Sequence, residues 1–112
     1  MELVEIQKRQ RKFIVERRWD RFRPSQIFTH LIEELGEIAS HLLFEEGYKK
    51  GNLGHERVKS ENLKREFAQA FNLFLQLAIH FEIDLEQAWL EEIDRMETRF
   101  NAKSWQKYLE QE

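Results

Sequence analysis

Ionisable side chains recur at helical spacing in the first half of the chain. They are His30, Glu34, Glu37 and His41. At about 100° per residue these positions share one edge of a helix, and farther along Glu66 and Gln69 lie in an equivalent position beside another apolar stripe. Packing the two stripes together would gather the carboxylates into a partly buried cluster. Because crowded carboxylates repel one another and are costly to desolvate, the pattern predicts a divalent cation between them.

The absence of Cys narrows the chemistry to carboxylate, imidazole, amide and water ligands, which favours hard cations. Mg²⁺ prefers a few carboxylates together with water and phosphate oxygens. Two simpler interpretations stay open: a solvated Glu-rich helix edge, and ordinary half-buried roles for His30 and His41. A ferritin-like di-iron site is disfavoured, because it needs Glu-x-x-His pairs and the residues three positions after Glu37 and Glu66 are Ser40 and Gln69.

Apolar periodicity indicates the helices that would position these side chains. The sequence predicts helices from about Glu2 to Arg21, Gln26 to Glu46, near Ser60 to between His80 and Glu82, and Leu85 to about Phe100, with a short helical tail from Trp105 to Glu112. Pro24 interrupts the first helix, and Ser25 can cap the second. Asp84 and Gln87 resemble a capping box, and the glycine-rich residues 47–60 are expected to form a loop.

Two apolar stripes predict that the second and third helices pack as an antiparallel pair. The first stripe contains Phe28, Leu31, Ile32, Leu35, Ala39, Leu42 and Leu43. The second contains Leu63, Phe67, Phe71, Phe74, Ala78 and Phe81. With one Pro and four Gly in 112 residues, long stretches lack helix breakers. We therefore expect one all-α domain over residues 1–112, a bundle of four main helices without a sheet.

Charge and hydropathy limit the location and the partners. No apolar run approaches the roughly 18 residues that span a bilayer, and the N-terminus lacks the apolar segment of a secretion signal, so a cytoplasmic protein without membrane contact is expected. The net charge is −3, yet one segment is strongly basic. Its cationic residues are Lys8, Arg9, Arg11, Lys12, Arg17, Arg18, Arg21 and Arg23. Both a solvated helix face and a surface for phosphate or nucleic acid fit this segment.

At the acidic positions the chain resembles the MazG-like, all-α nucleotide pyrophosphohydrolases. The resemblance covers about residues 19–100 and rests on FTHLIEELGEIASHLL, from Phe28 to Leu43, and REFAQAFNLFLQLAIHFEIDLEQAWLEE, from Arg65 to Glu92. That family's signature is Glu-x-x-Glu on one helix and Glu-x-x-Asp on the next. The signature residues bind Mg²⁺, which activates water to cleave a nucleoside triphosphate into a monophosphate and pyrophosphate.

The match to that signature is incomplete. Glu34 and Glu37 match the first half and Glu66 begins the second, but Gln69 stands at the Asp position. A later family phrase, close to Lys-x-x-Lys-Asn-x-x-Arg-Tyr, appears as residues 92–100, where only Arg95, Arg99 and the aromatic Phe100 correspond and Met96 replaces Asn. Gln69 should weaken Mg²⁺ binding because an amide contributes a dipole where Asp contributes a full charge.

The resemblance implies a role for each site residue. Glu34, Glu37 and Glu66 would hold Mg²⁺, or Mn²⁺, with support from Gln69, while Glu33 would orient or deprotonate water. Trp19 and Phe22 are candidates for stacking on a base, although both also suit a core. The residues expected to reach phosphate groups are Lys49, Lys50, Arg57, Arg95 and Arg99.

Two further expectations concern function and assembly. The alternative to an enzyme is a non-catalytic helical module that binds nucleotide, nucleic acid or protein through the basic first helix, and the replacement of Asp by Gln69 favours it. A homodimer or a dimer of dimers is also predicted, because nine Phe and three Trp are many rings for one small core. The family resemblance implies dimers as well.

Overall fold

The computed structural model describes residues 1–57 and 62–111 and is helical throughout its regular elements. The α-helices are α1 (Leu3–Glu16), α2 (Pro24–Glu45), α3 (Leu63–His80), α4 (Leu85–Arg99) and α5 (Ala102–Glu110). Two short 3₁₀ turns, η1 (Trp19–Arg21) and η2 (Gly51–Leu53), lie between them. These two described ranges contain no strand, so the predicted all-α class is confirmed.

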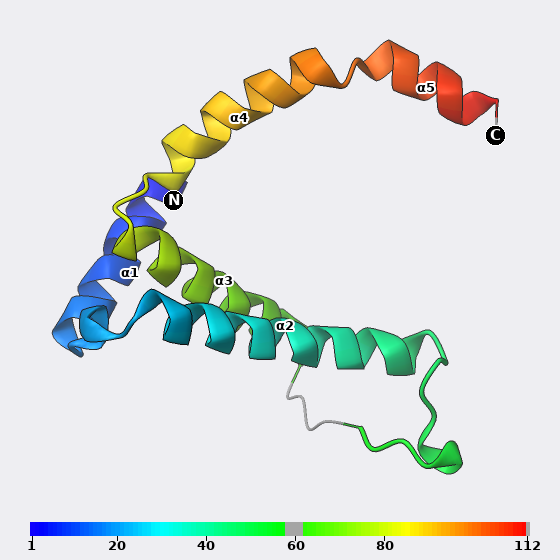
Figure 1. The fold of residues 1–112 in the computed structure, drawn as a ribbon, viewed down its shortest axis with the longest axis horizontal. Helices are drawn as coiled ribbons and strands as arrows, with labels where there is room; N and C mark the ends of the chain where they lie inside the picture. Colours follow the sequence, from blue (N-terminus) through cyan, green and yellow to red (C-terminus); the bar gives the residue numbers. More distant parts are fainter. Residues whose placement is uncertain (58–61, 112) are drawn as a thin grey trace.

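The helices divide into a packed body and an arm (Figure 1). In the body, α2 and α3 run side by side in opposite directions, as predicted, and α1 lies against α3. The arm consists of α4 and α5, of which α4 contacts α1. The predicted packing of four helices into one bundle is therefore not formed within a single chain.

The first helix is shorter than predicted because the chain turns before Pro24. Helix α1 ends at Glu16, and Arg18 adopts a left-handed backbone with φ of 58°. Helix α2 starts with Pro24 in its first turn, where the missing N–H of proline costs nothing. The predicted Ser25 cap is wrong: Arg23 is the capping residue, and its N–H donates to Gln26 Oε1 at 2.9 Å.

Side-chain caps define the starts of the two later helices. Asn62 accepts a hydrogen bond from the Arg65 N–H at 2.8 Å and so begins α3, while the predicted start at Ser60 lies outside the described residues. Asp84 accepts from the Gln87 N–H at 3.2 Å. The Gln87 side chain bonds to Glu91 at 3.1 Å, so only half of the predicted capping box forms.

A small core holds the body together. Leu31, Ile38 and Ala70 form its buried centre between α2 and α3, with Leu63 and Leu73 packed around them. Among the large side chains that are fully buried are Ile14 of α1 and Leu75 of α3. This packing fixes the register between α2 and α3 and therefore the positions of the polar side chains beside it.

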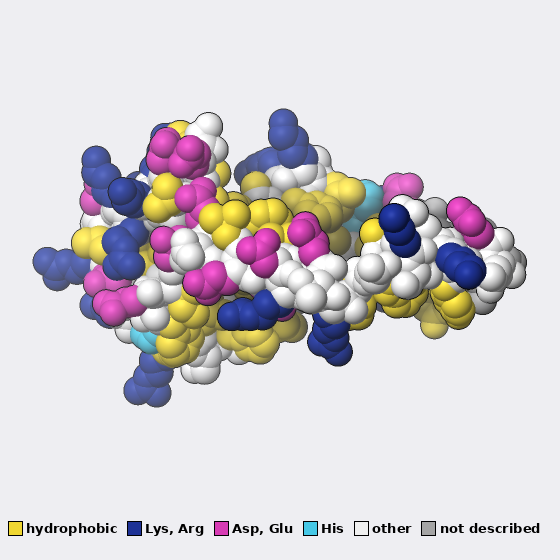
Figure 2. Space-filling view, turned by 90° about the horizontal axis from the view of Figure 1, so that it is seen from above, with side chains coloured by type: hydrophobic (Ala, Val, Ile, Leu, Met, Phe, Trp, Pro, Cys, Tyr) yellow, Lys and Arg dark blue, Asp and Glu magenta, His cyan; other side chains and the backbone are white. Residues whose placement is uncertain are grey.

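The predicted buried stripes are wrong for most of their large residues. Leu31 and Ala78 are buried, but seven others form an exposed surface, which we call the apolar face: Phe28, Ile32, Leu35 and Leu42 of α2 with Phe67, Phe71 and Phe74 of α3. Phe81, at the end of α3, is also exposed. The reason is geometric, since each helix is apolar over a wider arc than one neighbouring helix can cover. On the side of the molecule seen from above in Figure 2, hydrophobic side chains also lie between charged ones.

Among the described residues, no helix combines the length and the apolar character that crossing a membrane requires.

Candidate functional site

The predicted acidic residues meet at one flank of the α2–α3 contact. Glu66 of α3 is only 3% exposed, and neither of its carboxylate oxygens has a hydrogen-bond partner among the described residues. Glu34 of α2 is half-buried, and its Oε2 is likewise buried without a partner. Buried ionisable oxygens are normally paired, because desolvating them without compensation is costly. We call Glu34, Glu37 and Glu66 the acidic cluster.

The charges of this cluster influence one another. The pKa of Glu37 is raised above its ordinary value of 4.5, mainly by the negative charge of Glu34 and next by burial. Smaller contributions come from the charge of Glu66, a hydrogen bond with Glu34 and the charge of Glu33. The three carboxylates are therefore close enough to repel, and a positive ion among them would relieve that repulsion.

The two histidines of this edge have separate partners. His30 Nε2 lies 3.4 Å from Glu34 Oε1, so His30 contacts the acidic cluster. His41 Nε2 lies 3.7 Å from Glu45 Oε1, one turn farther along α2. His41 is half-buried, as the simpler interpretation expected, whereas His30 is exposed.

The fit of a metal ion to these residues depends on the side-chain rotamers. In the described parts of the chain, no three His, Asp or Glu side chains are already arranged to hold a metal. Glu34 is oriented toward His30, and its negative charge raises the pKa of the Glu37 carboxyl. Nevertheless, the unpartnered oxygens of Glu34 and Glu66 are the donors that Mg²⁺ or Mn²⁺ accepts. The donor atoms are therefore of the type that a hard cation binds, but in the described residues the three carboxylates are not gathered around one point.

Gln69 and Glu33 lie at the periphery of this cluster. Gln69 is exposed on α3, one turn after Glu66. Glu33 is exposed on α2 and close enough to Glu37 to raise the pKa of that carboxyl. Both residues border the cluster, and neither belongs to its buried part.

A mostly apolar pocket of about 440 Å³ adjoins the acidic cluster. It is lined by Trp19, Phe22, Gln26, Ile27, His30, Leu73 and Gln76. His30 belongs to this lining and also contacts Glu34, so the pocket and the cluster are continuous along α2. The predicted aromatic pair Trp19 and Phe22 thus lines a pocket that His30 links to Glu34, and both rings are partly exposed.

Sequence reasoning missed Gln76, which helps to shape this pocket. Its side chain is buried, and its amide donates to the carbonyl oxygen of Trp19 at 3.3 Å. This bond ties the η1 turn to α3. The available signal was a single amide within the apolar run Leu73–Ile79, where an unpaired polar group would be costly.

The predicted phosphate-binding residues lie in two places. Lys49, Lys50 and Arg57 follow the C-terminal end of α2, where the Arg57 guanidinium lies 4.9 Å from the centre of the Phe44 ring. The other two, Arg95 and Arg99, belong to α4, which extends away from α2 and α3 (Figure 1). Within one chain, these two arginines are therefore not brought to the acidic cluster.

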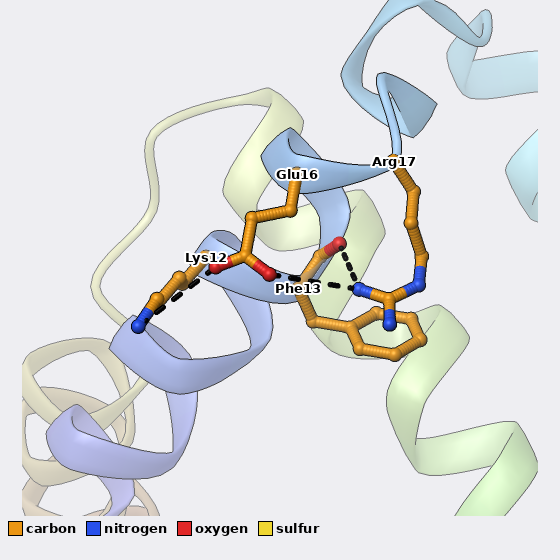
Figure 3. Close-up of polar contacts among 4 residues, drawn as sticks. All are labelled: Lys12, Phe13, Glu16 and Arg17. Carbon is orange, nitrogen blue, oxygen red and sulfur yellow. Dashed lines mark hydrogen bonds and ion pairs between the residues drawn. The ribbon is translucent and has the colours of Figure 1, made fainter.

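The basic segment is exposed, and its paired residues are Lys12 and Arg17, whose contacts are drawn in Figure 3. Glu16 lies 3.8 Å from Lys12 and 3.9 Å from Arg17, and the Arg17 guanidinium is 3.7 Å from the centre of the Phe13 ring. Arg17 also donates to the carbonyl oxygen of Phe13 at 3.1 Å. The remaining six form no ion pair with a described residue: Lys8, Arg9, Arg11, Arg18, Arg21 and Arg23. Their charge remains available to an anionic partner.

Comparison with known proteins gave no match to a protein-family model, to a curated protein or to a solved structure. A functional assignment for this chain therefore rests on its own residues and their arrangement.

Proposed function

We propose that this protein is a Mg²⁺-dependent hydrolase of nucleoside triphosphates, related to the MazG-like pyrophosphohydrolases, that releases pyrophosphate and a monophosphate. The observation that supports it best is the buried Glu66 carboxylate. It has no partner of its own and lies among Glu34 and Glu37, whose like charges should expel it unless a cation binds. A solvated helix edge would not bury Glu66.

In this proposal, the residues of the acidic cluster bind the metal ion and a neighbouring residue activates water. Glu34, Glu37 and Glu66 would hold Mg²⁺ or Mn²⁺, and Gln69 would support it from the rim. When bound, the ion supplies positive charge for phosphate oxygens and lowers the pKa of a coordinated water. Glu33, exposed beside Glu37, would orient that water or accept its proton.

The adjoining pocket suits the base of the nucleotide. The rings of Trp19 and Phe22 offer apolar faces for a planar heterocycle, while His30 and the amides of Gln26 and Gln76 offer polar groups. Lys49, Lys50 and Arg57 follow the opposite end of α2, where the helix continues for about 12 Å past Glu37, so they could meet only phosphates that extend beyond the cluster.

A panel of nucleoside triphosphates incubated with Mg²⁺ or Mn²⁺ tests the proposal, with pyrophosphate release as the readout. Wild-type protein should release pyrophosphate from at least one triphosphate, and Glu66→Gln should reduce the rate by 100-fold or more, on the order of one lost catalytic interaction. Glu97→Gln is a matched control, since Glu97 is exposed on α4. Absence of pyrophosphate release with every triphosphate and both ions would reject the enzymatic assignment.

The alternative is a non-catalytic helical module that binds an anionic partner through α1. Its specific support is the set of unpaired cations described above, together with the exposed Gln69 in place of the family's Asp. This module would bind a labelled single-stranded oligonucleotide in a salt-dependent manner and show no hydrolysis.

We also propose self-association, as a homodimer or a dimer of dimers. The exposed rings of the apolar face support it, because monomers rarely leave contiguous apolar patches of this kind in water. Light scattering that gives the 13.8 kDa monomer mass at micromolar concentration would contradict it.

A further inference from the structure

The α4–α5 arm buries none of its residues in its own chain. Its large exposed apolar side chains are Trp89, Leu90, Met96, Phe100, Trp105, Tyr108 and Leu109. On α5, Trp105, Tyr108 and Leu109 share one side of a helix of only nine residues. A helix that short is marginal in water and needs a packing surface to persist.

The surface area of the chain indicates how much is left to be buried. The accessible area is 9531 Å², whereas a compact monomer of this mass exposes about 6,600 Å². The radius of gyration is 18.6 Å, compared with about 13 Å for a compact domain of this length. The excess area of about 2,900 Å² meets the roughly 1,000 to 2,500 Å² per partner that permanent homodimers bury.

The base of the arm is fixed to α1. The Gln7 side-chain N–H donates to the Ile83 carbonyl oxygen, and the side-chain Oε1 of Gln7 accepts from the Leu85 N–H at 3.1 Å. These two bonds hold the residues just before and at the start of α4. The arm therefore points away from the body in a direction set by α1, so the apolar face of the same chain is not its natural docking site (Figure 1).

We propose that the α4–α5 arm of one copy packs on the apolar face of a second copy, and that the second copy's arm packs reciprocally on the first. Both surfaces are apolar, both are unpartnered within one chain, and the excess area of the whole chain is of the size that a permanent dimer buries. Reciprocal exchange closes the assembly with twofold symmetry, so no apolar surface of either kind is left over. The proposal deepens the self-association proposed above and does not depend on hydrolytic activity.

Introduced cysteines test this contact directly, because the natural chain has none. Two single variants, Phe71→Cys on the apolar face and Tyr108→Cys on the arm, are mixed, allowed to exchange subunits and treated with a short bismaleimide. Lys103→Cys, on the opposite side of α5 from Tyr108, is the matched control. Trp105→Cys and Phe67→Cys form a second pair in case either first variant fails to fold.

The expected result is a crosslinked species of twice the monomer mass that contains one chain of each variant. The control pair of Lys103→Cys with Phe71→Cys should crosslink at least tenfold less. Efficient crosslinking of Phe71→Cys to itself would overturn the proposal, since it would show that two apolar faces meet each other. Crosslinking within one chain of the double variant at high dilution would also overturn it, by showing that the arm folds back.

Discussion

The α2–α3 pair and the α4–α5 arm have similar sequence patterns, but their apolar residues are buried to different extents within the chain. In both regions apolar residues recur at three- and four-residue spacing. Yet the pair buries Leu31, Ile38 and Leu75, whereas no residue of the arm is fully buried, and Trp89 and Trp105 are exposed. Apolar periodicity therefore identifies which side of a helix is suited to packing. It does not identify which other helix packs against that side.

The largest expected effect concerns the pair. Leu75 is fully buried, so Leu75→Ala should lower the free energy of unfolding by about 2–5 kcal/mol, from lost transfer energy and a residual cavity. Leu53→Ala, in an exposed turn, is the control and should stay within about 0.5 kcal/mol of wild type. Chemical denaturation measures all of these values. Leu109→Ala on the arm sharpens the comparison: an effect as small as that of Leu53→Ala would mean that the arm stays in solvent.

The second prediction concerns the divalent cation that we propose for the acidic flank of the pair. Gln69→Asp should strengthen Mg²⁺ binding, and each tenfold gain in affinity adds about 1.4 kcal/mol of stability when the ion is in excess. Without metal the same change should destabilise the fold by roughly 0.2–0.5 kcal/mol, because it places a like charge one turn from Glu66. Thermal melts with and without millimolar Mg²⁺ provide the measurement. If neither Mg²⁺ nor Mn²⁺ changes the melting temperature of wild type or of Gln69→Asp, the result would favour the non-catalytic module.

The third prediction tests how the arm is joined to the body. Gln7→Ala removes both side-chain bonds to the α3–α4 connection and should cost about 1 kcal/mol locally. The Leu85 amide should then exchange its hydrogen faster, while amides in the centre of α3 keep the wild-type rate. Equal exchange at Leu85 in both proteins would show that α1 does not fix the direction of the arm.

The smallest expected effect is a change in the pH dependence of stability. Because the folded chain raises the pKa of Glu37 above 4.5, the folded state retains this proton to higher pH than the unfolded state does. Stability from this group is therefore complete below pH 4.5 and is lost as the pH rises through the folded pKa. Glu37→Gln should be more stable than wild type above that window, in metal-free buffer, and the advantage should disappear below it. A constant difference at every pH would contradict the repulsion described here.

The sequence was sufficient for most of the helices because their signals are local. Pro24, the Asp84 cap and the long apolar periodicities place helix boundaries within a few residues. The sequence did not predict the end of α1 at Glu16, because the local pattern gives no sign of the left-handed backbone at Arg18. Residues three and four apart also placed Glu34 and Glu37 on one edge correctly.

What could not be predicted depends on contacts between distant elements. The apolar spacing predicted that Phe67 and Phe71 belong to the core, but both are exposed. Spacing alone cannot distinguish the side of α3 that packs on α2 from a side that stays exposed. Similarly, the burial of Glu66 and the bond from Gln76 to η1 arise from the register of α3 against α2 and the chain before it. These long-range contacts decide which carboxylate is buried and where the pocket opens.

The central claim is that the acidic cluster binds a divalent cation, and Mn²⁺ binding followed by electron paramagnetic resonance tests it most directly. The signal of free Mn²⁺ should fall when wild-type protein is added and recover when excess Mg²⁺ competes. Glu66→Gln should leave most of the ion free, whereas the Glu97→Gln control should bind as wild type does. If wild-type protein and Glu66→Gln leave the same concentration of free Mn²⁺, the acidic cluster is not a metal site. That result would contradict the proposed Mg²⁺-dependent hydrolase.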